Sequence, residues 1–155
     1  MVAELIPEAA AAVFHGHPGN KGDAIRWGRA LGAKMADLLS YQGHGGLAYG
    51  HGVPILWPVI MEGGFQVNLA GERFSNEALG YSEQAAVILA QPGHVAWTIY
   101  DARLHALMLE FDDYHDALQA GAIKTAPDLA TLAAMTQLPA AKLNETVSAV
   151  ETMTR

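Results

Sequence analysis

The sequence predicts an α+β fold, in which a small β hairpin or sheet is combined with helices and followed by a C-terminal helical hairpin. The chain has 155 residues, of which 51% are hydrophobic and 16% charged, so it can bury a core. Its middle third is glycine-rich with strand-like runs, whereas its last third has helical spacing. This length leaves no room for both a dinucleotide-binding domain and a separate substrate domain.

Composition excludes several classes of partner. Nine Lys and Arg against sixteen Asp and Glu give 9 − 16 = −7, so we expect no nucleic-acid or membrane partner. The absence of cysteine excludes disulfides and thiolate metal sites and fits the cytoplasm. Residues 1–8 carry acids where an export signal needs positive charge, and the apolar stretch 47–61 is broken by glycine and proline. We therefore expect a cytoplasmic protein.

The first half of the chain predicts one helix and one hairpin. Apolar residues recur every three to four positions over residues 22–36, after Asn20 and with Asp23 near the start, which predicts a helix there. The runs 65–68 and 72–75 flank a short turn with glycine, which is typical of a hairpin.

The second half predicts mostly helices. Residues 82–90 and 103–109 have helical spacing, and residues 94–100 alternate like a buried strand between them. Thr125, three residues before an acid, predicts the N-cap of a helix that covers residues 128–136. A second helix is expected to begin at Pro139 and to pack against it as the helical hairpin.

Two motifs suggest ligand sites that other features of the sequence argue against. His15 and His17 would share one face of an extended chain, with further histidines nearby, but no pair has a zinc-site spacing. The stretch 43–48 satisfies G-x-G-x-x-A, the dinucleotide-binding fingerprint. Glycines and a proline follow this stretch where that fingerprint needs a helix, so we expect no dinucleotide there. We also expect no metal, because the histidine spacing is not that of a zinc site.

Three segments in a fixed order are the most informative part of the sequence. They are Asn20-Lys-Gly-Asp23-Ala-Ile, Tyr41-Gln-Gly-His44 and Asn68-Leu-Ala-Gly71-Glu-Arg-Phe-Ser-Asn-Glu77-Ala-Leu-Gly-Tyr81. Together they resemble the flavoprotein subunits of fumarate reductases and succinate dehydrogenases, with their tricarballylate and ketosteroid dehydrogenase relatives. The resemblance implies that residues 1–43 are a remnant of the edge of a flavin domain and that residues 44–155 are the capping (substrate) domain.

The resemblance also implies roles for single residues. The flavin-contacting aspartate of the family falls on Asp23 and its substrate-binding histidine on His44. A threonine and a glutamate that clamp a carboxylate in fumarate reductases fall on Leu56 and Trp57, which cannot replace them, so fumarate and succinate are poor candidates. The proton-donating arginine falls on Tyr81, as in ketosteroid dehydrogenases, where a tyrosine assists proton transfer. A simple packing role for Tyr81 remains the alternative.

The resemblance thus predicts an internal fragment of an FAD-dependent oxidoreductase that exchanges hydride between a substrate C–H bond and flavin. FAD and a small-molecule substrate would be bound in the intact parent protein, whereas the chain alone is expected to be inactive and to lack cofactor. The missing flavin domain would be its partner. The alternative is a stand-alone, non-catalytic interaction module with the same fold. An exposed apolar face would allow a homodimer.

Overall fold

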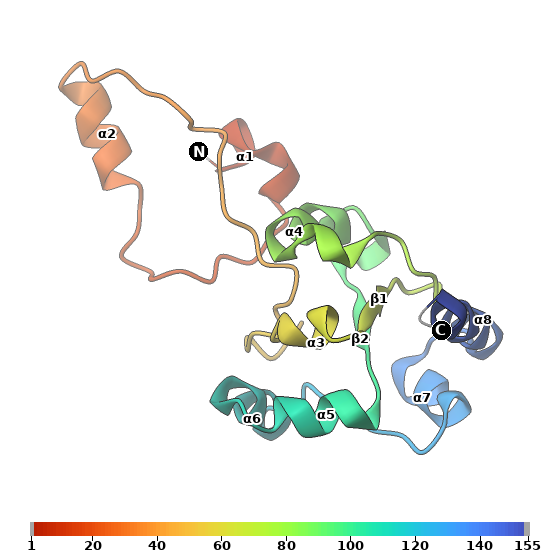
Figure 1. The fold of residues 1–155 in the computed structure, drawn as a ribbon. Coiled ribbons are helices and arrows are strands. Elements are labelled where there is room, and N and C mark those ends of the chain that lie inside the picture. Colours follow the sequence, from red (N-terminus) through yellow and green to blue (C-terminus); the bar gives the residue numbers. More distant parts are fainter. Residues whose placement is uncertain (1, 154–155) are drawn as a thin grey trace. The chain divides into compact units, whose positions relative to one another are not determined.

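The computed structural model describes residues 2–153, and it divides into two compact units, Met1–Gln42 and Gly43–Arg155. The first unit contains α1 (Val2–Leu5), the 3-10 helix η1 (Pro7–Ala9) and α2 (Asp23–Ala30). The second contains α3 (Pro58–Met61), β1 (Phe65–Val67), η2 (Glu77–Leu79), α4 (Tyr81–Leu89), η3 (Pro92–His94), β2 (Trp97–Ile99), α5 (Ala102–Met108), α6 (Asp112–Gln119), α7 (Leu129–Thr136) and α8 (Ala140–Met153). Figure 1 shows these elements.

The first unit has little core of its own. Helix α2 ends at Ala30, so the helix predicted over 22–36 is too long. Gly32 adopts a φ of +76°, a left-handed conformation that stops the helix. Large apolar side chains of this unit are exposed, among them Phe14, Trp27 and Leu31.

The sheet of the second unit has two short antiparallel strands. β1 pairs with β2, with Phe65 opposite Ile99 and Val67 opposite Trp97 (Figure 1). All three residues of β1 are buried, because helices and loops cover both of its faces. The partner of β1 is therefore about thirty positions further along the chain, on a strand that the sequence also predicted.

The predicted hairpin of residues 65–75 is wrong in its second strand. A turn does form, since the Gly71 amide donates to the Asn68 carbonyl at 2.9 Å and the Asn68 amide to the Glu72 carbonyl at 3.0 Å. Only one bridge follows, between Val67 and Arg73. The turn packs on α8 instead: a Cβ added at Gly71 would lie 3.2 Å from the Leu143 backbone nitrogen.

The helices beyond the sheet follow the sequence closely, with one correction at a cap. Helices α4, α5 and α7 lie within about one residue of their predicted ranges. The N-cap of α7 is Asp128, whose carboxylate accepts from the Thr131 amide at 2.7 Å, so the Thr125 cap was wrong. Helices α7 and α8 pack together as the predicted helical hairpin. The short α6 was not predicted.

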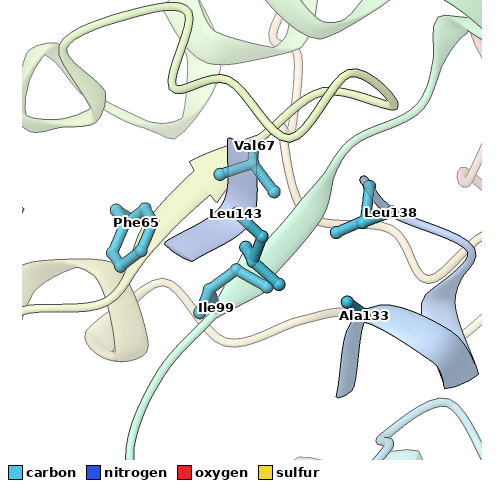
Figure 2. Close-up of a cluster of buried hydrophobic side chains, with 6 residues drawn as sticks. All are labelled: Phe65, Val67, Ile99, Ala133, Leu138 and Leu143. Carbon is cyan, nitrogen blue, oxygen red and sulfur yellow. The ribbon is translucent and has the colours of Figure 1, made fainter. Parts of the chain in front are cut away.

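The main core joins the sheet to this helical hairpin. Figure 2 shows Phe65 and Val67 of β1 and Ile99 of β2 facing Leu143 of α8. Ala133 of α7 and Leu138 of the connection complete the cluster. A second cluster centres on Val59, Met108 and Tyr114 and joins α3, α5 and α6. The fold is thus mostly helical, with one two-stranded antiparallel sheet. None of its described helices is long and apolar enough to cross a membrane.

Leu143 is the best single test of this core, because its side chain is completely buried. Leu143→Ala is expected to lower the free energy of unfolding by about 2–5 kcal/mol, through lost apolar burial and a new cavity. Leu79→Ala is the control, because Leu79 is 70% exposed. Urea unfolding followed by circular dichroism measures both, and equal losses for the two variants would contradict this packing.

Candidate functional site

Three aromatic rings of the second unit form the candidate site. The rings of His44 and Tyr81 have centroids 5.2 Å apart with a tilt of 34°, and the Trp57 ring meets Tyr81 edge-on at 6.2 Å. His44 lies in the loop at the start of the second unit, Tyr81 is the first residue of α4, and Trp57 is the residue before α3. The His44 side of the cluster is open to solvent, and Tyr81 is 37% exposed. Two proton-carrying groups are therefore held side by side at the surface of this unit.

The backbone next to His44 is fixed by two hydrogen bonds. The Gly45 amide donates to the Tyr81 carbonyl at 2.9 Å, and the Gly45 carbonyl accepts from Gln66 Nε2 at 3.0 Å. Glycine is required here, because a Cβ at position 45 would lie 2.9 Å from the Gln84 Cβ. The loop that carries His44 is thus pressed against α4, which carries Tyr81.

A buried carboxylate lies at the centre of the polar network beneath this loop. Glu77 is 2% exposed and accepts from the Gln66 amide at 2.8 Å. Arg73 binds the same carboxylate through Nε and Nη2, the latter at 2.6 Å. The hydrogen bond to Glu77 raises the pKa of the Arg73 guanidinium above its ordinary value, against the opposing effect of desolvation. The pair links β1 to the turn that follows it through charge-assisted hydrogen bonds.

Two buried amides extend this network to α4. Gln84 donates from Nε2 to Gln66 Oε1 at 2.8 Å, and it also bonds Ser75. Gln66 further reaches Thr98 Oγ1 on β2 at 3.3 Å. Both amide side chains are 2% exposed. Every polar atom of the Gln66 side chain therefore has a partner, which fixes its rotamer.

The remaining predicted residues lie elsewhere. Asp23 belongs to the first unit, where it opens α2 and forms an ion pair with Arg26. Leu56 packs in the second apolar cluster, beside Val59. The structure thus brings His44, Tyr81 and Trp57 together, whereas Leu56 serves the core.

Neither of the two weaker motifs has a counterpart in the structure. No group of three or more His, Cys, Asp or Glu that could hold a metal occurs among residues 2–153. The stretch 43–48 forms a loop, and the next helix begins only at Pro58. That loop closes through a bridge between Leu47 and Pro54, so the glycines do not lead directly into a helix N-terminus that could receive a pyrophosphate.

The residues that the structure describes do not form a complete site for FAD. A dinucleotide is held by a strand, a glycine-rich turn and a helix that follow one another in the sequence. This strand–turn–helix motif does not occur in the part of the chain covered by residues 2–153. Helix α2 begins after Gly22, but its first residue is Asp23, whose carboxylate would repel a phosphate. A carboxylate at that place suits a hydroxyl group instead.

Sequence reasoning missed the network beneath the site. Gln66 lies between two buried apolar residues of β1, so strand alternation places its side chain on the opposite face of the strand. From the sequence alone, that face would be expected to be exposed to solvent. Only the tertiary structure shows that the Gly45 loop and α4 cover that face. The sequence offered one indication of this network, namely a single glutamine between two apolar residues, Phe65 and Val67, of a strand.

Comparison with known proteins identifies the class. The family described as FAD binding domain matches residues 1–155. The chain is 31% identical over 147 residues to a fumarate reductase (cytochrome) of Shewanella frigidimarina, covering 95% of this chain and 25% of that protein. It is 28% identical over 114 residues to an NADH:fumarate oxidoreductase of Klebsiella pneumoniae (strain 342), covering 74% and 12%. The open conformation of a flavocytochrome c3 fumarate reductase matches with a TM-score of 0.78 at 26% identity, over 95% of this chain and 26% of that one.

These similarities place the chain in a flavoprotein family, and the proteins that it resembles over part of their length include fumarate reductases. The chain belongs to the FAD binding domain family, and that family binds FAD. It spans about a quarter of the length of the Shewanella protein. The family resemblance found in the sequence is thereby confirmed at this level.

Glu77 tests the network under the site. Glu77→Gln is expected to lower the free energy of unfolding by about 1–3 kcal/mol, because Arg73 loses its charged partner. Solvent screening limits the loss, because Arg73 is one-third exposed. Glu72→Gln is the matched control, since the Glu72 carboxylate is 53% exposed and 3.4 Å from Lys142. Chemical unfolding measures both variants, and a loss no larger for Glu77→Gln than for Glu72→Gln would contradict the network.

Proposed function

We propose that this chain contributes the substrate side of an FAD-dependent oxidoreductase that exchanges hydride between a substrate C–H bond and the flavin. The observation that carries the proposal is the ring contact of His44 with Tyr81, 5.2 Å between centroids, in a chain of this family. In this reading residues 44–155 are the capping domain, and residues 1–43 belong to the edge of a flavin domain.

His44 and Tyr81 have separate roles in the proposal. The exposed imidazole of His44 orients a substrate carbonyl or carboxylate by hydrogen bonding. The Tyr81 hydroxyl assists proton transfer at the neighbouring position, and the backbone bond from Gly45 to the Tyr81 carbonyl keeps the two groups in register. Asp23 is proposed to contact the flavin from the first unit.

Trp57 supports a substrate less charged than a four-carbon dicarboxylate. Its indole ring lies edge-on to Tyr81, where a carboxylate clamp would need a charged or hydroxyl group. The Nε1–H of Trp57 is buried and has no hydrogen-bond acceptor among residues 2–153. A substrate with an apolar body beside the indole ring would suit these surroundings better than one with a carboxylate there.

The first unit supports a partner for this chain. Phe14, Trp27 and Leu31 are each more than two-thirds exposed, and such side chains are typical of a surface that another protein part covers. We assign that cover to a flavin domain. Without that cover, the exposed surface would allow the chain to form a homodimer. The second candidate function, a non-catalytic module, would instead have such a surface covered within its own fold.

Tyr81→Phe tests the catalytic role, because it removes only the hydroxyl. In the FAD-loaded protein that carries this chain, turnover is expected to fall by about 100-fold or more, the usual contribution of a positioned proton donor. Tyr49→Phe is the control, since Tyr49 is 82% exposed and makes no ring contact with His44. Steady-state rates measure both variants.

Unchanged turnover in Tyr81→Phe would assign Tyr81 to packing instead. The same assay compares fumarate with uncharged unsaturated ketones as substrates, and the ketones are expected to react faster. Faster reduction of fumarate would contradict the substrate class argued from Trp57.

Cofactor binding is tested on the 155-residue chain itself. The purified chain is expected to lack the yellow flavin absorbance and to leave the fluorescence of added FAD unquenched, because its described residues do not form a dinucleotide site. A visible spectrum followed by FAD titration measures this. Bound flavin would contradict the division between capping and flavin domains.

A further inference from the structure

Two buried amide side chains in the second unit have no role in the core. Gln66 and Gln84 are each 2% exposed, and each occupies a place where an apolar side chain would bury at lower cost. Phe65 and Val67, on either side of Gln66, pack in the main core on the other face of β1. The amide pair therefore costs stability at this position unless its hydrogen bonds do something that packing cannot.

The hydrogen bonds of Gln66 lead directly to the candidate site. Its Nε2 donates to the Gly45 carbonyl at 3.0 Å, and the Gly45 amide donates to the Tyr81 carbonyl at 2.9 Å. Both polar groups of the Gly45 backbone are thus used, and this residue directly follows His44. An apolar residue at position 66 would leave the buried Gly45 carbonyl without this donor.

Gln66 itself is held from three sides. Gln84 donates to its Oε1 at 2.8 Å, Thr98 accepts from its Nε2 at 3.3 Å, and Glu77 accepts from its backbone amide at 2.8 Å. The amide group therefore has a single orientation, with its donor aimed at the Gly45 carbonyl. A side chain fixed in this way can hold the loop that it binds in one position.

We propose that Gln66 is a positioning residue for the His44–Tyr81 pair, with Gln84 orienting its amide. Gln66 acts through the Gly45 peptide, whose carbonyl accepts from Gln66 Nε2 and whose amide is bonded to α4. The inference rests on the proposed function, in which these two rings carry the chemistry. It adds that their spacing depends on a hydrogen-bond donor at position 66.

The test uses Gln66→Met in the 155-residue chain, because methionine keeps the length of the side chain and removes the donor. In solution NMR, nuclear Overhauser effects between the His44 and Tyr81 ring protons are expected in the wild type and lost in the variant. Protection of the Gly45 amide from hydrogen exchange should fall about tenfold, as expected for the loss of one buried hydrogen bond. Contacts between Phe65 and Ile99 should persist, which separates lost positioning from lost folding.

Gln91→Met is the matched control, since Gln91 is a partly buried glutamine whose side chain bonds Asn68 and the Val87 carbonyl. If Gln66→Met does not fold, Gln84→Met replaces it, because loss of the Gln84 donor frees the Gln66 amide to turn away from Gly45. Ring contacts and Gly45 protection that survive in the folded variant would overturn the proposal. The NMR and exchange measurements need neither FAD nor substrate. A negative result would therefore overturn the positioning role of Gln66, whereas the Tyr81→Phe rates test the proposed function separately.

Discussion

A buried carboxylate organises the second unit. Glu77 is 2% exposed, and it joins the turn after β1 to the strand itself by accepting from both Arg73 and the Gln66 amide. A charge in such a place is tolerated only when it is fully paired, so the surrounding chain has little freedom to rearrange. Residues 66–77 are thereby held in one conformation. The Gly45 loop and α4 are hydrogen-bonded to this segment through Gln66.

This constraint explains how an exposed site can be precise. His44 lies in a glycine-rich loop and Tyr81 at the first turn of a helix, places where side chains are ordinarily mobile. The Gly45 peptide ties the two backbones together through one bond to the Tyr81 carbonyl and one to Gln66. The backbone segments that carry the two rings are therefore joined by buried polar contacts beneath them, an arrangement that would suit the proposed catalytic pair.

The predictable features of this chain are those with local causes. Helix α4 and the α7–α8 hairpin follow from apolar spacing and helix starts. Ordered motifs predicted His44 and Tyr81 as site residues, and the structure places their rings in contact. The pairing of β1 with β2 depends on segments far apart in the chain, so a nearby hairpin was the simpler interpretation. Gln66 was missed for the same reason, since strand alternation alone places it toward solvent and only distant segments cover it.

Native-state hydrogen exchange of the Gln66 backbone amide tests the central claim most directly. This amide donates to the buried Glu77 carboxylate, not to a strand partner, so its protection reports on the network itself. If the network holds the site together, this amide should exchange as slowly as those of the main core, through global unfolding. Exchange as fast as that of the exposed loop around Gly50 would show that the carboxylate does not organise this part of the molecule.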